Sequence, residues 1–148
     1  MENQNYNATI KVSQSANEVF KSINSVTKWW TENLEGSSEK LNDVFKLLWG
    51  GNSYVTIKIT ESVPEKKVVW LVTDCYLDWL KDKHEWTNTK MSFEISTENN
   101  STTIQFTHIG LVPEIECYND CVKGWDQYVK GSLLKLITEG EGQPQRKK

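Results

Sequence analysis

His108 and Asp74 are the residues whose types and positions best suit acid–base chemistry. His108 is in phase with Ile104 and Phe106, so alternation places it on the same, inward face of a strand. There it could orient a ligand or act as a general acid or base, since its ordinary pKa lies near neutrality. Asp74 follows another apolar run, and an inward Asp74 beside His108 would form a minimal pair. Nothing in the sequence shows that they meet, so a histidine bonded to backbone and a solvent-facing Asp74 are the favoured interpretations.

The cysteines do not predict a metal site. Cys117 and Cys121 are one helical turn apart, a spacing that binds metal only when further ligands join. The two histidines, His84 and His108, are distant in sequence. We interpret the pair as buried, inert thiols and expect no metal and no cofactor. The sequence also lacks the glycine-rich phosphate motifs, the G-x-S-x-G motif and the H-E-x-x-H motif.

A column of small residues, Cys117, Gly124 and Gly131, is spaced by seven, with Tyr128 on its shoulder. A glycine inside a helix costs about 1 kcal/mol relative to alanine, so two glycines need a reason. Room for a ligand is one reason. Close approach by the sheet or by the Trp29-Trp30 segment is the other, and the two stay open.

The connection 79–86 carries Trp79 and Trp86 among charged residues and could cover the mouth of a cavity. Packing of both indoles on the shell of the domain is the simpler interpretation. Aromatic residues among lysines also occur in single-strand nucleic-acid platforms. This connection has only two lysines, offset by acidic residues, and therefore does not favour nucleic acid.

These residues need a scaffold, and the hydrophobic pattern predicts six strands, with a seventh possible. A clean alternation over 6–13 predicts the first strand, and Ser15-x-x-Glu18 is a capping box that predicts a short helix after it. Glycine near position 36 indicates a loop. The remaining strands are expected at 44–49, 54–60, 68–75, around 91–95 and at 102–109.

The C-terminal part changes to a helical period. Apolar residues spaced by three or four predict one helix from about 114 to about 138, ended by Gly140. The residues expected to face the sheet are Ile115, Val122, Trp125, Val129 and Leu133. This order of elements predicts an α+β fold in which a curved antiparallel sheet wraps around the long helix.

Length, composition and charge fit one soluble domain. The chain has 148 residues, of which 37% are hydrophobic, and a net charge of −3, which argues against a basic nucleic-acid-binding surface. We expect a single domain over 1–142 and a polar, disordered tail over 143–148. The polar N-terminus, the lack of an apolar run of about 18 residues and the odd cysteine count lead us to expect a cytoplasmic protein without membrane insertion.

Three stretches resemble the START-like, Bet v 1-like (SRPBCC) superfamily, and within it the short proteins related to the activator of Hsp90 ATPase. They are Trp29-Trp30-Thr31, the stretch 106–113, and the stretch 124–133 in the long helix. The resemblance implies a helix-grip fold with a hydrophobic cavity between sheet and helix. Across the superfamily this cavity serves lipids, sterols, polyketides and plant hormones, in carriers, cyclases and co-chaperone modules.

We therefore expect cytosolic binding of a small hydrophobic molecule, lipid-like or polyketide-like, by a monomer that is more a binding protein than an enzyme. Two other classes stay open: a protein-interaction or co-chaperone-like module, and a cyclase or dehydratase that uses the same cavity. The expected lining combines aromatic rings with the polar groups of a histidine and a tyrosine. These lining residues are Trp70, Phe93, Phe106, His108, Trp125 and Tyr128.

Overall fold

The computed structural model describes residues 5–48, 52–78, 80–112 and 118–144. Its strands form one antiparallel sheet in the order β1-β7-β6-β5-β4-β3-β2. The strands are β1 (Tyr6–Val12), β2 (Leu34–Gly36), β3 (Val44–Leu48), β4 (Tyr54–Val63), β5 (Lys67–Tyr76), β6 (Lys90–Glu98) and β7 (Ser101–Ile109). The helices are α1 (Ala16–Asn24), α2 (Val26–Trp29), α3 (Tyr118–Trp125), the π-helix η1 (Asp126–Leu133) and α4 (Leu134–Glu139).

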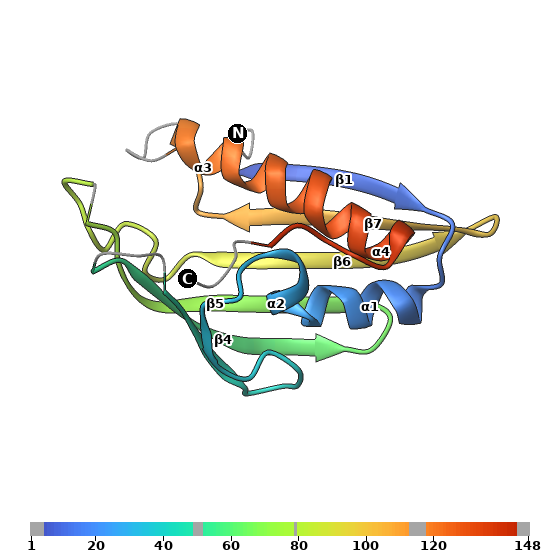
Figure 1. Cartoon of the computed structure of the whole chain (residues 1–148), viewed down its shortest axis with the longest axis horizontal. Coiled ribbons are helices and arrows are strands. Elements are labelled where there is room, and N and C mark those ends of the chain that lie inside the picture. Colours follow the sequence, from blue (N-terminus) through green and yellow to red (C-terminus); the bar gives the residue numbers. More distant parts are fainter. Residues whose placement is uncertain (1–4, 49–51, 79, 113–117, 145–148) are drawn as a thin grey trace.

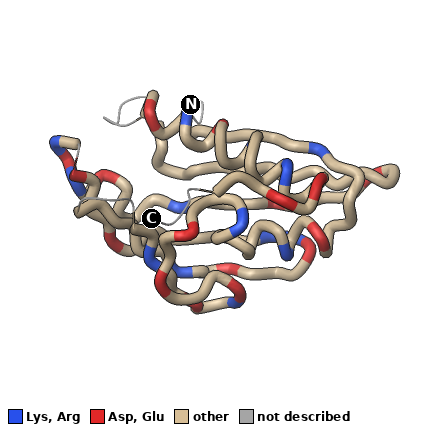
Figure 2. Tube along the Cα trace, viewed as in Figure 1, with Lys and Arg blue, Asp and Glu red and all other residues tan. Residues whose placement is uncertain are grey.

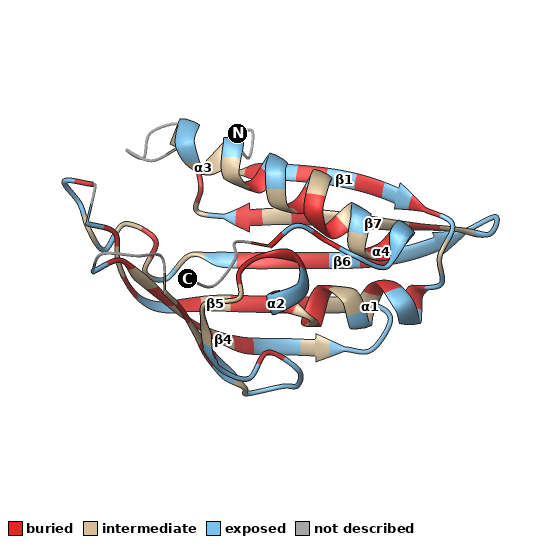
Figure 3. Ribbon diagram, in the orientation of Figure 1, coloured by how far each residue is buried: buried red, intermediate tan, exposed pale blue. Residues whose placement is uncertain are grey.

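The helices cover one face of the sheet (Figure 1). α3, η1 and α4 form a continuous helical stretch, of which η1 and α4 pack on β1, while α1 packs on β6. Buried residues alternate along the strands on the covered face, and the helices bury the sides turned toward it (Figure 3). This is the predicted helix-grip α+β fold, and the core lies between the sheet and the helices.

Local signals explain where the elements begin and end. The Ser15 hydroxyl accepts a hydrogen bond from the Glu18 amide at 3.2 Å, which starts α1 as the capping box predicts. Asn99 and Asn100 both have positive φ and make the tight turn between β6 and β7. Gly140 ends α4 in the left-handed conformation, also as predicted.

Two details differ from the sequence-based expectation. The stretch around Gly36, expected as a loop, contains β2, a three-residue edge strand. The long helix is a π-helix in its middle, and the part of its predicted N-terminal turn that includes Ile115 lies outside the described residues. Among the described residues, no helix is long and apolar enough to cross a membrane.

The chain after Gly140 folds back over the helices (Figure 1). Gly142 and Pro144 are buried, and the amide of Gln143 donates to the Ser132 hydroxyl at 2.6 Å. We call residues 140–144 the C-terminal strap. Of the tail expected to be disordered, 145–148 lie outside the described residues, whereas Gln143 and Pro144 belong to this strap.

Candidate functional site

The interior between sheet and helices is filled by aromatic rings from three parts of the chain. We call this group the aromatic core. Its members are Trp29, Trp30, Trp70, Trp86, Phe93, Phe106 and Trp125. Trp30 stacks on Trp70 with centroids 6.0 Å apart and contacts Trp125 at 4.9 Å. Trp125 in turn stacks on Trp86 at 6.1 Å, so the rings form a continuous series.

Strand register brings the sheet's share of these rings together. Phe93 of β6 pairs directly with Phe106 of β7, and their ring centroids are 4.8 Å apart. Trp70 of β5 lies 4.8 Å from Phe93 by the same measure, and none of the three side chains is exposed. Alternation along the strands therefore explains why Phe93 and Phe106 point inward. Trp70 also points inward, although the sequence of its strand, which is apolar on both faces, does not decide its side.

His108 connects β7 to the long helix and to the loop after β5. The Trp125 indole Nε1–H donates to His108 Nδ1 at 3.0 Å, so the neutral ring carries its proton on Nε2. That nitrogen donates to Thr89 Oγ1 at 3.0 Å, and the Thr89 hydroxyl donates to the carbonyl of Trp86 at 2.6 Å. Both ring nitrogens of His108 are thus engaged within the protein.

The surroundings of His108 keep it neutral. Its side chain is fully buried, and the edges and faces of Trp86 and Trp125 lie against the ring. Burial lowers the pKa of His108 to about 3 because the charged form would lose its hydration. A group with this pKa and no free nitrogen is a structural connector rather than a proton carrier near neutral pH.

Asp74 does not join His108. It is exposed, and its Oδ2 accepts a hydrogen bond from the Tyr54 hydroxyl at 2.8 Å. The physical reason is a β-bulge: the register with β4 shifts between Val72 and Asp74, which reverses the alternation that turns Trp70 and Val72 inward. The structure thus supplies no acid–base pair from these two candidates.

Trp70 has a polar atom that nothing satisfies. Its indole Nε1 is buried, and no described residue offers it a hydrogen-bond acceptor. An unpaired buried donor typically costs about 1–3 kcal/mol, so such atoms call for an explanation. Tyr128, the other polar group expected in the lining, is half-buried beside the core, and burial raises its pKa.

The two helix glycines are not explained by close packing. A Cβ on Gly124 would meet no atom within 4 Å, and one on Gly131 would meet only the Asp126 carbonyl of the same helix at 4.0 Å. Neither the sheet nor the Trp29-Trp30 segment crowds them, so the close-approach interpretation is wrong. Gly131 lies inside η1, a π-helix in the middle of the long helical stretch.

The structure also describes some of the other residues singled out in the sequence. Cys121 is disulfide-bonded and half-buried, whereas it was expected to be a buried thiol; Cys117 lies outside the described residues. Trp86 is buried, as the packing interpretation of the 79–86 connection predicts, while Trp79 lies outside the described residues. Thr89 had no signal in the sequence that linked it to His108.

Charged groups are spread over the molecule. Figure 2 shows acidic and basic residues interspersed along the trace rather than basic residues gathered on one element. Within the described ranges, no three His, Cys, Asp or Glu residues are grouped so that they could hold a metal ion.

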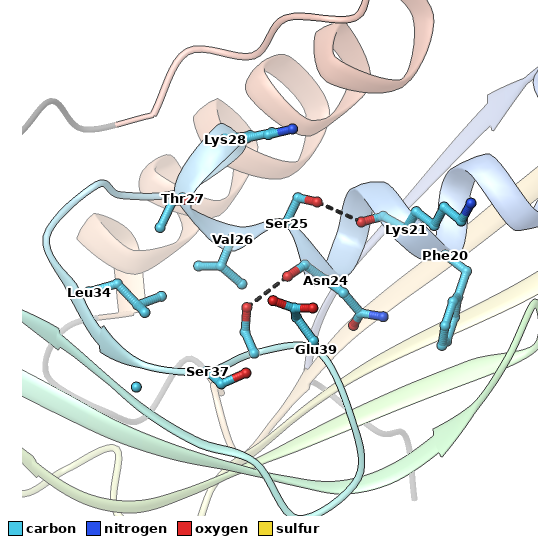
Figure 4. A pocket seen from close by; sticks show the side chains of 12 residues that line it. Phe20, Lys21, Asn24, Ser25, Val26, Thr27, Lys28, Leu34, Ser37 and Glu39 are labelled. Carbon is cyan, nitrogen blue, oxygen red and sulfur yellow. Dashed lines mark hydrogen bonds between the residues drawn. The ribbon is translucent and has the colours of Figure 1, made fainter.

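A surface groove lies beside the core, between α1, α2 and the stretch 34–39 (Figure 4). Its volume is about 660 Å³, and its apolar wall is made by Phe20, Val26 and Leu34. We call it the α1–α2 groove. None of the six predicted lining residues borders it.

Solved structures share this architecture. The Aha1 dimer from Colwellia psychrerythraea is 23% identical, with a TM-score of 0.74 over 93% of this chain and 98% of that chain. DynU16, described as a putative protein in the dynemicin biosynthetic locus, is 12% identical, with a TM-score of 0.69 over 95% and 49%. CalU16 from Micromonospora echinospora is 13% identical, with a TM-score of 0.61 over 88% and 73%.

At these identities the structural likeness shows a common fold. Among curated proteins none matches the chain. A family model described as "Activator of Hsp90 ATPase homolog 1-like protein" matches residues 15–138, which is most of the chain. The chain therefore belongs to the family of activator of Hsp90 ATPase homologue 1-like proteins, as the tryptophan pair and the long helix predict.

Proposed function

We propose that this chain binds a small, mostly apolar molecule that carries a hydrogen-bond acceptor, between the sheet and the long helix. The single observation that supports this most is the unpaired Nε1–H of Trp70 in an interior otherwise built from aromatic faces. A carbonyl or phenol oxygen would satisfy this donor, and the surrounding rings would receive the apolar body. Lipid-like and polyketide-like molecules with such an oxygen meet both conditions.

The polar handle in this proposal is Trp70 rather than His108. A ligand that bonded to His108 would have to replace Trp125 or Thr89, each of which already holds one ring nitrogen at 3.0 Å. Trp70 requires no such exchange. Its neighbours Phe93 and Trp30 offer ring faces for an aromatic ligand.

A ligand can reach the interior only if the long helix moves, and the glycines and π-helical turns of this helix favour such movement. π-helical turns are rare and often mark functional positions, and a glycine loosens the helix that contains it. Gly131 lies inside η1, and Gly124 lies one residue before Trp125, whose ring covers the core. Displacing this ring would uncover Phe106 and Trp30, the second of which stacks on Trp70.

Tryptophan-specific NMR tests the proposal directly. Protein labelled with ¹⁵N at tryptophan indoles is titrated with the flavanone naringenin and, separately, with dodecanoate. We expect the Trp70 indole signal to move most, because its N–H gains an acceptor. The Trp29 signal is the internal control, since that N–H already donates to the Ile23 carbonyl at 3.1 Å.

A matched variant separates hydrogen bonding from packing. Trp70→Phe keeps an aromatic ring and removes the donor, so the dissociation constant should rise about 2- to 12-fold, the range for one hydrogen bond. Trp29→Phe should change it less. If neither probe moves the Trp70 signal at millimolar concentration, the interior is closed to ligands. The protein-interaction alternative would then take its place.

A further inference from the structure

The α1–α2 groove contains a second buried polar atom without a partner. Asn24 ends α1 and is only 8% exposed, and it borders the groove. Within the described part of the chain, its Oδ1 finds no donor. This atom is distinct from the Trp70 indole, and the groove shares no lining residue with the six predicted for the interior.

Asn24 is not needed to finish the helix. The last four carbonyls of a helix lack intrahelical partners, and those of α1 are all satisfied by other groups. The carbonyls of Lys21, Ser22, Ile23 and Asn24 accept from the Ser25 hydroxyl, the Ser25 amide, the Trp29 indole and the Ser38 hydroxyl. The Asn24 side chain is therefore free to serve a ligand.

The charged groups around the groove indicate which sign of charge a ligand there would carry. Glu39 is an exposed acid that lines the same groove as Asn24, and the C-terminal end of α1 adds partial negative charge. Lys21 and Lys28 border the groove, but their ammonium groups extend away from its centre (Figure 4). Asn24 Oδ1 and Glu39 thus offer the groove an unpaired acceptor and a negative charge.

From these contacts we infer that the α1–α2 groove binds a small organic cation, a protonated amine on a short apolar chain. The ammonium group donates to Asn24 Oδ1 and faces the Glu39 carboxylate, and the chain lies on the apolar wall of Phe20, Val26 and Leu34. A volume of about 660 Å³ accommodates a molecule of this size. This site goes beyond the proposed interior site and does not depend on it.

Three probes of equal length test the charge requirement. Hexylamine, hexan-1-ol and hexanoate are titrated into the full chain, with backbone amide shifts of Asn24, Val26 and Ser38 as the readout. We expect hexylamine to bind most tightly and hexanoate to bind least. Equal or tighter binding of hexanoate would overturn the inference. A shift of the Trp70 indole by hexylamine, without shifts at the groove, would overturn it as well.

Substitutions at the groove test the assigned atoms. Asn24→Asp replaces the unpaired amide with a carboxylate, and should tighten hexylamine binding by about 5-fold because a charged acceptor bonds more strongly. Glu39→Gln should weaken it about 2- to 5-fold, the range for an exposed charge pair. Glu35→Gln is the control, since Glu35 is an exposed acid of β2 that does not line the groove. Unchanged or weaker binding by a folded Asn24→Asp variant would contradict the role of Asn24.

Discussion

The neutral state of His108 follows from its hydrogen bonds to Trp125 and Thr89 and from its burial. The lone pair of His108 Nδ1 already accepts the Trp125 N–H, so a second proton could bind there only if that hydrogen bond broke. Burial also removes the water that would stabilise a charge. Protonation would therefore break the link between β7 and the long helix. We therefore expect His108 to act as a pH-sensitive part of the core.

Acid should destabilise the fold through this residue. In the folded protein burial lowers the pKa of His108 to about 3, whereas an unfolded histidine titrates near ~6.5. Between these values the unfolded state binds more protons, so the contribution of His108 is complete above about pH 6.5 and falls as the pH decreases toward 3. The slope is at most about 1.4 kcal/mol per pH unit. Urea denaturation at pH 7, 6, 5 and 4 measures it.

Two variants isolate this contribution from the carboxylates that titrate in the same range. His108→Gln can keep an acceptor for Trp125 and a donor for Thr89 but has no proton to gain, so its free energy of unfolding should fall less between pH 7 and 4. His84→Gln changes an exposed histidine and should behave as the parent protein does. Equal slopes for His108→Gln and the parent would show that burial of His108 does not set the acid response.

At the residue scale, the sequence predicts whether a side chain points inward or outward better than it predicts the hydrogen-bond partners of that side chain. Alternation with Ile104 and Phe106 placed His108 inward because β7 is regular over its whole length. Its partner Thr89 could not be predicted, since it lies in an irregular connection. Asp74 is exposed, as the favoured interpretation expected, but the bulge that turns it outward has no residue pattern that predicts it.

Among the elements, the long helix and the C-terminal strap each contain a glycine, and the surroundings of the two glycines differ. A Cβ on Gly124 would meet no atom within 4 Å, whereas one on Gly142 would lie 2.5 Å from the Lys28 carbonyl oxygen. Gly124→Ala should therefore stabilise the protein by about 0.5–1 kcal/mol through helix propensity. Gly142→Ala should destabilise it by about 1–3 kcal/mol through overpacking. Chemical denaturation of both variants measures these changes.

The two substitutions are the same chemical change, so each is the control of the other. Opposite signs are the expected outcome. A destabilised Gly124→Ala variant would mean that α3 needs glycine for a reason other than space. A stable Gly142→Ala variant would mean that the strap can move away from α2 without loss.

Element boundaries were predictable where local chemistry sets them. The Ser15 cap, the Asn99-Asn100 turn and Gly140 each act within a few residues, so the sequence shows them. The π-helical turns of η1 were not predictable, because the apolar spacing of three and four residues is equally compatible with an α-helix. β2 was missed because a three-residue edge strand is too short to show alternation.

Across the whole molecule, hydrogen bonds hold the long helical stretch near Asp126 and near Ser132, in addition to the Trp125–His108 bond. At the start of η1, the Tyr6 hydroxyl of β1 donates to Asp126 Oδ1 at 2.5 Å, and burial together with this bond raises the pKa of Tyr6. Near its end, Ser132 accepts from the strap. Directly before Asp126, the helix holds Trp125 over the aromatic core. An opening that displaces Trp125 breaks its bond to His108, and release of Asp126 or Ser132 would favour such an opening.

Removing the C-terminal strap should release the hydrogen bond to Ser132. A chain ended after Gly140 loses the bond from the Gln143 amide to Ser132 and the cover over the seam between α2 and η1. We expect amides at the end of α2, such as that of the C-cap residue Trp30 bonded to the Val26 carbonyl, to exchange hydrogen roughly fivefold faster, since one hydrogen bond contributes about 1 kcal/mol. Amides shared by β6 and β7 should keep their rates, because their hydrogen bonds are made within the sheet. Ser132→Ala in the full chain removes only the acceptor and should give a smaller change at the same amides. Equal acceleration in the sheet would indicate general destabilisation, and unchanged α2 amides would show that the strap does not hold the helices together.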